Sequence, residues 1–158
     1  MSTTHTIVLA GGCFWGMEEL FAQQEGVITT EVGYTGGRND SPTYEFHPGH
    51  AEALRITYDP EATSIVALYD YFFRIHDPTT VNRQGNDVGV SYRSAIFCAD
   101  DEQLHEAEEA VRRNQVYWEN PIVTTLEPLT VFWSAEEYHQ QYLQKNPGGY
   151  TCHFERAR

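Results

Sequence analysis

Residues 7–16 read Ile7-Val8-Leu9-Ala10-Gly11-Gly12-Cys13-Phe14-Trp15-Gly16 and place a cysteine between two kinds of local structure. The apolar run at 7–10 predicts a strand over residues 5–10. The residues after Cys13 have helical composition and predict a helix over residues 14–24, with Met17, Leu20 and Phe21 on one face. Cys13 is therefore expected at the junction of the first strand and the first helix.

Cys13 is expected to be a reactive thiol. The unpaired N–H groups at a helix N-terminus, and the positive end of the helix dipole, favour a thiolate, so this position predicts a lowered pKa. Gly12 and Gly16 allow tight backbone geometry and leave the sulfur uncrowded. The alternative is a small core cysteine, because free cysteine is among the most buried residue types.

Size and composition predict one folded catalytic domain over residues 1–158. A chain of 158 residues can bury a core without added cross-links, and 41% hydrophobic residues are typical of a globular protein. The 23 acidic and 10 basic residues give a net charge of −13, which argues against binding to nucleic acid or to an anionic membrane surface. We expect a soluble monomer.

No segment indicates a membrane span or a targeting signal. No stretch approaches the ~18 apolar residues that a membrane-spanning helix needs. Residues 1–6 contain no Lys or Arg, and the apolar run 7–10 is too short for the core of a signal peptide. A cytoplasmic location is therefore expected.

The rest of the chain alternates between helix and strand patterns. Ser64 is placed to cap a helix that ends at Asp77-Pro78, and Ser134 with Glu137 forms a capping box for a last helix that ends near residue 146. This alternation, with long irregular loops, predicts an α/β fold of the α+β plait type, a two-layer mixed sheet packed with helices. Further strands are predicted over 27–33, 53–58 and 93–98, a further helix over 101–116, and an extended segment over 124–132.

Two connections, at about 34–49 and 79–91, are longer than the simple connecting loops of a compact domain, and we expect them to contain functional residues. Glu52 enters a strand beside apolar residues, where partial desolvation would raise the pKa of its carboxyl and keep it protonated as a donor. An exposed glutamate at a strand edge is the alternative. The other candidates are Tyr44, His47, His50, Asn82, Asp87, Tyr92 and Arg93, of which the tyrosines have packing as their alternative role.

The three cysteines do not form a disulfide framework. Cys98 lies between apolar residues of a predicted strand and is expected to be buried and inert. Cys152 lies in a C-terminal tail, from about residue 147, that has no predicted regular structure and is expected to be mobile. A mobile thiol there is able to reach back to Cys13 and form a disulfide during turnover.

The histidines and cysteines do not predict a metal site. His47 and His50 flank Pro48-Gly49 and lack the helical spacing that places two imidazoles on one face. Cys152 and His153 are adjacent and would point in different directions. We expect no metal ion and no organic cofactor.

The run at 12–16 resembles the active-site signature of the peptide methionine sulfoxide reductase A family. The likeness extends in order over nearly the whole chain, and its joint specificity is high. It continues through Gly33-Tyr34-Thr35-Gly36-Gly37, Pro42-Thr43-Tyr44, Gly49-His50-Ala51-Glu52-Ala53, Tyr58-Asp59-Pro60, His76-Asp77-Pro78-Thr79-Thr80, Asn82-Arg83-Gln84-Gly85-Asn86-Asp87, Tyr92-Arg93-Ser94-Ala95-Ile96 and Asn146-Pro147-Gly148-Gly149-Tyr150.

This resemblance implies reduction of methionine S-sulfoxide, free or in proteins, with thioredoxin as the electron source and protein repair as the purpose. It implies that Cys13 is the nucleophile and that Cys152 is the resolving cysteine. The remaining implied roles concern the sulfoxide: Glu52, Tyr44 and Tyr92 surround its oxygen, Asp87 supports that polar network, and Phe14 and Trp15 hold the methyl group.

Two features depart from the resemblance. The short segment between Tyr44 and Gly49 lacks a cysteine that longer members carry there, and no second cysteine follows Cys152. A cycle with one resolving cysteine, from Cys13 to Cys152, is therefore expected.

Two other functional classes remain open from the sequence. A cysteine hydrolase or acyltransferase would pair Cys13 with His50 or His139 as base and use Asp87 to orient it. A redox-sensing binding module would use a Cys13–Cys152 disulfide only to change shape.

Overall fold

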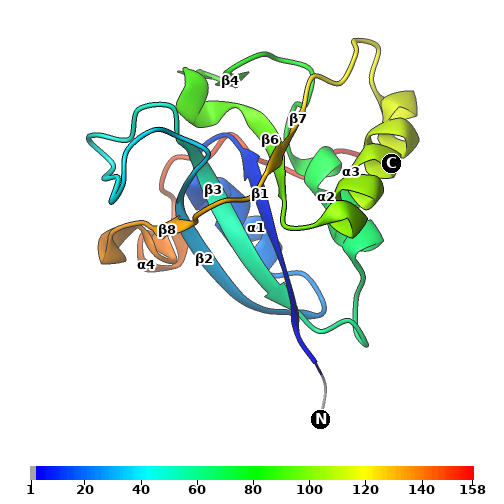
Figure 1. Cartoon of the computed structure of the whole chain (residues 1–158), viewed down its shortest axis with the longest axis horizontal. Coiled ribbons are helices and arrows are strands. Elements are labelled where there is room, and N and C mark those ends of the chain that lie inside the picture. Colours follow the sequence, from blue (N-terminus) through cyan, green and yellow to red (C-terminus); the bar gives the residue numbers. More distant parts are fainter. Residues whose placement is uncertain (1–2) are drawn as a thin grey trace.

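A computed structural model of the chain describes residues 3–158, and a six-stranded sheet runs through it in the order β7-β6-β1-β3-β2-β8 (Figure 1). The long strands at its centre are β1 (His5–Gly11), β3 (Ala51–Tyr58) and β2 (Val27–Thr35). The shorter strands are β6 (Ser94–Cys98), β7 (Thr125–Pro128) and β8 (Trp133–Ser134). Residues 1–2 of the predicted 1–158 domain lie outside the described residues.

The sheet is mixed, as predicted. Strand β1 pairs antiparallel with both β3 and β6, and β2 pairs antiparallel with β3 and β8. Only the β6–β7 pair is parallel. The register of β2 with β3 places Tyr34 opposite Glu52, so the start of β3 lies beside a buried aromatic residue.

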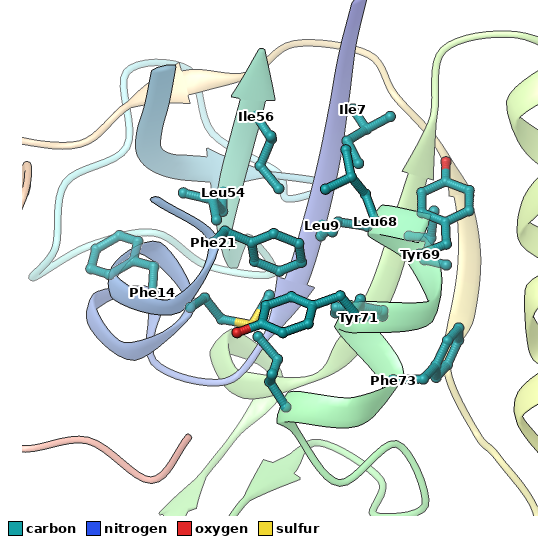
Figure 2. Close-up of a cluster of buried hydrophobic side chains, with 14 of the residues drawn as sticks. Ile7, Leu9, Phe14, Phe21, Leu54, Ile56, Leu68, Tyr69, Tyr71 and Phe73 are labelled. Carbon is teal, nitrogen blue, oxygen red and sulfur yellow. The ribbon is translucent and has the colours of Figure 1, made fainter. Parts of the chain in front are cut away.

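The main core lies between the sheet and the helices α1 (Phe14–Ala22) and α2 (Ile65–Ile75), as Figure 2 shows. Alternate residues of β1 point to this face, which places Ile7 and Leu9 beside Leu54 of β3. Phe21 of α1 reaches the same cluster, and its ring lies 5.2 Å from that of Tyr71 in α2. This packing fixes α1, and with it the start of the first helix, against the sheet.

The opposite face of the sheet carries smaller residues. Val8 and Ala10 of β1 pack with Ala53 and Phe97, and Phe132 covers the cluster from outside. Within residues 3–158, no helix packs on this face, so the helices and the sheet form two layers. The predicted two-layer arrangement is confirmed.

Three of the predicted helices are present. Ser64 caps α2 as expected, because its hydroxyl accepts a hydrogen bond from the Ala67 N–H at 3.0 Å. Asp100 caps α3 (Asp101–Asn114) by accepting from the Gln103 N–H at 2.8 Å. A 3-10 turn, η2 (Gln115–Tyr117), follows α3 where the sequence predicted two more helical residues.

The predicted last helix is wrong. Its place is taken by a 3-10 turn, η3 (Glu137–His139), and by one short helix, α4 (Tyr142–Lys145). Ser134 belongs to β8, and its hydroxyl donates to Glu31 instead of capping a helix. Gln140 bonds both backbone groups of Val32 at 3.0 Å, and Gln141 has a left-handed φ of 50°. These contacts with β2 outweigh the local helical preference.

The long loops flank one end of the sheet. Residues 36–50 contain no helix or strand. The loop at 79–91, expected to be irregular, includes a small hairpin of β4 (Arg83–Gln84) and β5 (Asp87–Val88), and the 3-10 turn η1 (Val90–Tyr92) overlaps its end. No helix within residues 3–158 is long and apolar enough to cross a membrane.

Candidate active site

Cys13 occupies the N-cap of α1, where the sequence placed it. Its backbone is extended, with φ −56° and ψ 124°, so the chain turns from β1 into α1 at this residue. The side chain is 8% exposed and makes no capping hydrogen bond to α1, although the backbone N–H of Trp15 lies near enough to lower the pKa of the thiol. The sulfur is thus held at the helix N-terminus with little contact with solvent.

The predicted lowering of the Cys13 pKa is wrong for the free protein. Burial raises the pKa of the thiol well above its ordinary value, and the nearby Glu52 carboxyl raises it further. The Trp15 N–H lowers it, as the helix argument required, but this effect is smaller than the cost of desolvation. Cys13 therefore rests as a neutral thiol, and sequence alone did not reveal how deeply it is buried.

Glu52 lies beside Cys13 at the start of β3. One of its carboxyl oxygens, Oε1, accepts a hydrogen bond from the Phe14 N–H at 3.2 Å, and the side chain is 1% exposed. Burial raises the pKa of Glu52 to about 8, against the lowering effect of that hydrogen bond. At neutral pH the carboxyl is mostly protonated, as predicted, and Oε1 is already used as an acceptor. The proton therefore belongs on Oε2, which makes it a hydrogen-bond donor.

Tyr44 and Tyr92 come together from the two long loops. Besides burial, negative charge on Glu52 and Cys13 raises the pKa of each phenol, so both tyrosines lie near these two groups. Burial is the main reason that the pKa of each phenol is raised, so both stay protonated. The Tyr44 N–H donates to Glu136 at 2.9 Å, which fixes its loop to the segment after β8. Two phenols and one carboxyl thus lie near the thiol.

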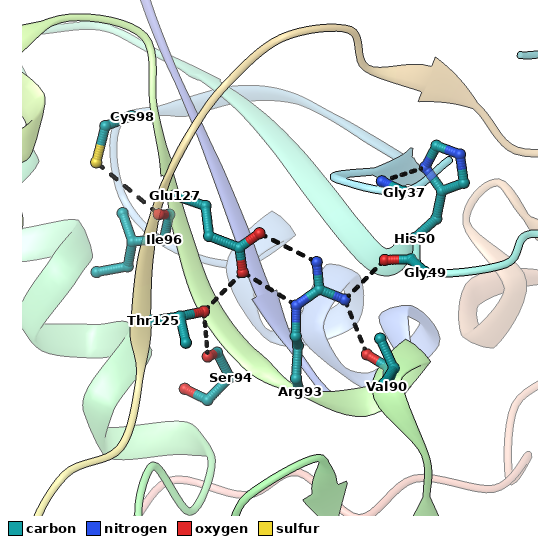
Figure 3. Close-up of polar contacts among 10 residues, drawn as sticks. All are labelled: Gly37, Gly49, His50, Val90, Arg93, Ser94, Ile96, Cys98, Thr125 and Glu127. Carbon is teal, nitrogen blue, oxygen red and sulfur yellow. Dashed lines mark hydrogen bonds and ion pairs between the residues drawn. The ribbon is translucent and has the colours of Figure 1, made fainter. Parts of the chain in front are cut away.

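Arg93 holds the two loops in place (Figure 3). Its guanidinium donates to the carbonyl oxygens of Gly49 at 3.1 Å and Val90 at 3.0 Å, and pairs with Glu127 of β7 at 3.0 Å. Gly49 precedes β3, and Val90 begins the turn that ends in Tyr92. The partly buried Arg93 therefore ties the loop before Glu52 and the turn that ends in Tyr92 to the sheet. The sequence had marked Arg93 as a candidate without assigning this role.

Asp87 and Cys152 complete the cluster. The Tyr150 hydroxyl donates to Asp87 Oδ2 at 3.4 Å. Burial raises the pKa of Asp87, and this carboxyl is coupled electrostatically to Cys13, Cys152 and Tyr92. The structure therefore brings both the loop carboxyl and the tail thiol to the site.

The three cysteines are free thiols. Cys98 is buried in β6, as predicted, and burial raises its pKa to about 11. Cys152 is partly exposed, with its sulfur 3.9 Å from the Gln84 carbonyl oxygen. The tail from 147 has no helix or strand but is packed against the body through His153 and Arg156. In Figure 1 the tail runs from α4 to the side of the molecule that carries α3.

Phe14 and Trp15 differ in their surroundings. Phe14 is 1% exposed, and its ring belongs to the main core. Trp15 is partly buried and stacks on Tyr142, with ring centroids 3.8 Å apart and planes 9° from parallel. Its indole Nε1 donates to His139 Nδ1 at 2.9 Å, so the orientation of the ring is fixed. Sequence reasoning missed Tyr142 here, because it depends on how the chain folds after residue 139.

The histidines do not supply a base for the hydrolase alternative. The Nδ1 of His50 accepts from the Gly37 N–H at 3.1 Å, and its Nε2 faces the Asn39 carbonyl oxygen at 2.9 Å, so both ring nitrogens are used. His139 accepts from Trp15 through Nδ1, which leaves the proton on Nε2. Neither ring is hydrogen-bonded to the Cys13 sulfur in the described structure, and burial lowers the pKa of both.

The sequence predicted no metal site. Within residues 3–158, no group of three or more His, Cys, Asp or Glu side chains is arranged to hold a metal ion. His47 instead bonds Thr43 O at 2.8 Å and Ser91 Oγ at 2.7 Å, which joins the two long loops.

Known proteins similar to this chain share a single description. The family model for peptide methionine sulfoxide reductase matches residues 5–158. The peptide methionine sulfoxide reductase MsrA of Nocardia farcinica (strain IFM 10152) is 56% identical over 158 residues, which cover 99% of this chain and 93% of that protein.

Solved structures give the same result. Mxr1 from Saccharomyces cerevisiae in reduced form superposes with a TM-score of 0.93 at 39% identity, covering 98% of this chain and 93% of the other. Mxr1 in complex with Trx2 superposes with a TM-score of 0.69 at 29% identity, covering 98% of this chain and 91% of the other.

Proposed function

The chain belongs to the peptide methionine sulfoxide reductase family, and we propose that it reduces methionine S-sulfoxide with Cys13 as nucleophile and Cys152 as resolving thiol. The substrate is methionine S-sulfoxide, free or in proteins, and the purpose is repair of oxidised proteins. The observation that carries this proposal is the burial of Glu52 beside Cys13, which raises the pKa of the carboxyl to about 8, with the phenols of Tyr44 and Tyr92 nearby.

In the first step the oxygen moves from the substrate sulfur to Cys13. A sulfoxide sulfur is a poor electrophile until its oxygen receives a proton or strong hydrogen bonds, which Glu52, Tyr44 and Tyr92 donate. One such donor to a developing oxyanion is worth about 2.7–4 kcal/mol in comparable sites. The Cys13 sulfur ends as a sulfenic acid that carries the oxygen and one proton, and methionine is released.

A neutral Cys13 thiol is compatible with this step, because its proton is transferred only when the sulfoxide is bound. A thiolate beside an ionised Glu52 would place two negative charges in a buried site, and after burial itself the Glu52 carboxyl is the next largest cause of the raised Cys13 pKa. With a bound sulfoxide, the Cys13 proton moves toward the sulfoxide oxygen as the sulfur attacks. No charge is then left unpaired in the site.

In the second step Cys152 attacks the sulfenic sulfur, and in the third a reductant opens the disulfide. Thiol–disulfide exchange with an external dithiol restores both cysteines and leaves the reductant oxidised. We propose a thioredoxin as the reductant, which the solved complex of Mxr1 with Trx2 supports. The Gly148 backbone, with a φ of +85° and open space beside it, is the proposed hinge for the tail.

The aromatic rings of Trp15 and Phe14 explain the selectivity for one sulfoxide epimer. Trp15 is fixed by His139 and Tyr142, so it presents one rigid apolar surface next to Cys13. We propose that Trp15, with Phe14 behind it, receives the substrate methyl group while the oxygen faces the donors. Only one epimer of a chiral sulfoxide satisfies both contacts.

We further propose that residues 1–158 act as one catalytic domain, as a monomer, in the cytoplasm, and without a cofactor. The support is chemical. Every step uses only thiols, one carboxyl and two phenols, and the three free cysteines are typical of a reducing compartment.

The test is a single-turnover assay on the two separated epimers of methionine sulfoxide. We expect release of methionine from the S epimer and none above background from the R epimer. The Cys13→Ser variant should release none from either. Equal release from both epimers would contradict the role given to Trp15, and release by Cys13→Ser would contradict the nucleophile.

A further inference from the structure

The imidazole of His153 lies against the backbone that leads into the reactive cysteine. Its Nε2 is 2.6 Å from the carbonyl oxygen of Gly11, and the side chain is 6% exposed. A carbonyl oxygen only accepts hydrogen bonds, so Nε2 carries the proton and Nδ1 holds the lone pair. This contact joins the C-terminal tail to the end of β1, two residues before Cys13.

Gly16 leaves the space that this ring occupies. A Cβ on Gly16 would lie 2.3 Å from Nδ1 of His153 and 2.4 Å from Oγ1 of Thr151, so a side chain there would displace the tail. Glycine is unfavourable within a helix, yet it stands in the first turn of α1. The packing of His153 gives a physical reason for it. The sequence had assigned this glycine to tight backbone geometry and to leaving the sulfur uncrowded.

Cys152 is positioned from the same point. Its sulfur is 4.0 Å from Nδ1 of His153 and 3.9 Å from the carbonyl oxygen of Gln84. The side chain of Gln84 in turn packs over Gly12, where a Cβ would lie 2.6 Å from its Cγ. Cys152 therefore lies against the β4–β5 hairpin, and Gln84 of that hairpin lies against the residue before Cys13.

The tail is tied to the body after Cys152 and has open space at Gly148, four residues before it. Beyond His153, the Arg156 N–H donates to Arg74 O at 3.2 Å, and Arg74 Nε donates to Arg156 O at 2.6 Å. Before it, a Cβ on Gly148 would meet nothing within 4 Å. Burial lowers the pKa of His153 to about 4, so the ring stays neutral and keeps its hydrogen bond throughout the physiological pH range.

We propose that His153 is the positioning residue for disulfide formation: its hydrogen bond to Gly11 holds Cys152 where it meets the sulfenic acid on Cys13. This inference rests on the proposed function. In that step the Cys152 sulfur attacks the Cys13 sulfur, the S–S bond forms, and the S–O bond breaks. The thiol proton of Cys152 leaves with the hydroxyl as water, so Cys13 is reduced and Cys152 is oxidised. His153 touches neither substrate nor the sulfoxide oxygen.

Two substitutions of His153 distinguish the effect of its hydrogen bond from the effect of the space that its ring fills. His153→Leu fills similar space without a donor, whereas His153→Gln keeps an N–H donor near the position of Nε2. His105→Leu, at an exposed position of α3, is the matched control. Two rates are measured in a single turnover without reductant: release of methionine, and loss of the second thiol. The sulfenic acid is trapped with dimedone and quantified by mass spectrometry.

For His153→Leu we expect methionine release within about twofold of the unmodified protein, disulfide formation slowed by about tenfold or more, and accumulation of the trapped sulfenic acid. His153→Gln should restore most of the disulfide rate, and His105→Leu should leave both rates unchanged. Should His153→Leu fail to fold, Gly16→Ala takes its place, because its Cβ displaces the ring. The ratio of disulfide formation to methionine release should fall in that variant as well.

Disulfide formation at the unmodified rate in His153→Leu would overturn the inference. Equal losses of both rates in the Leu and Gln variants would also overturn it, because they would indicate a purely structural role. If the unmodified protein releases no methionine, the proposed function itself fails, and the assay reports that separately.

Discussion

At the scale of single residues, the site is built from groups that stay neutral. Cys13 is a thiol and Glu52 is a carboxylic acid at neutral pH, because burial disfavours the charged form of each. A buried neutral acid can donate to a sulfoxide oxygen, which an ionised one cannot. The chemistry therefore depends on the pKa of Glu52 as much as on the sulfur.

Glu52→Gln is expected to keep part of the activity and Glu52→Ala to lose far more. The amide of Gln still donates a hydrogen bond, whereas Ala has no donor and leaves the Phe14 N–H unpaired. Loss of a donor to a developing oxyanion costs about 100–1,000-fold in rate. Single-turnover rates of methionine release check this, and equal losses in the two variants would count against a donor role.

The pH dependence of the same step gives a second readout. The folded pKa of Glu52 is raised to about 8, so its proton is present below that pH and lost as the pH rises through it. Methionine release should therefore decline above about pH 8, and Glu52→Gln should lack this decline because an amide does not titrate there. A decline that persists unchanged in Glu52→Gln would assign it to another group.

The reactivity of Cys13 toward iodoacetamide should follow a raised pKa. Only the thiolate reacts, so the alkylation rate should still be rising above pH ~8.5, where an ordinary thiol is half ionised. Alkylation of each cysteine is followed by peptide mass spectrometry across the pH range, with free cysteine as the reference. A rate that is half-maximal below pH 7 would show that the helix N-terminus outweighs burial.

At the scale of elements, one buried carboxyl fixes α1 to its neighbours. Glu18 accepts hydrogen bonds from the Thr30 hydroxyl at 2.9 Å and from the Gln141 N–H at 2.7 Å. These contacts tie the helix that begins at Cys13 to β2 and to the turn before α4. They also hold Gln141 in its left-handed conformation, which orients the segment that carries Tyr142.

Glu18→Ala is expected to lower the free energy of unfolding by about 2–3 kcal/mol, because it leaves two partly buried donors, the Thr30 hydroxyl and the Gln141 N–H, unpaired. Glu19→Ala, the neighbouring acid, contacts only Gln23 at the surface and should change it by less than about 0.5 kcal/mol. Urea unfolding of both variants measures the difference. Similar stabilities for the two would show that the Glu18 contacts contribute little.

At the scale of the whole molecule, the sequence predicted what depends on local pattern. The helix capped by Ser64, the helix that begins at Asp101, the central strands and the junction at Cys13 follow from periodicity and capping, and they are present. The protonated state of Glu52 was also predicted, because apolar neighbours in sequence indicated its desolvation.

The features that depend on distant contacts were not predicted. The prediction of the last helix was wrong because two side chains bond to the sheet instead of to their own turn. Gln140 bonds to β2, and Ser134 bonds to Glu31. The raised pKa of Cys13 reflects burial by other elements, which competes with the helix N-terminus. The hydrogen bond between His153 and Gly11 joins residues 142 positions apart, and no local sequence pattern predicts such a contact.

The central claim is that Cys13 takes the oxygen and Cys152 resolves the product. It is tested by counting thiols in the denatured protein before and after one turnover with methionine S-sulfoxide. The free protein has three free thiols, and we expect one, that of Cys98, to remain as one equivalent of methionine is released. In Cys152→Ser we expect about one equivalent of methionine and then no recycling by thioredoxin. Three thiols after turnover, or normal recycling by Cys152→Ser, would contradict the account.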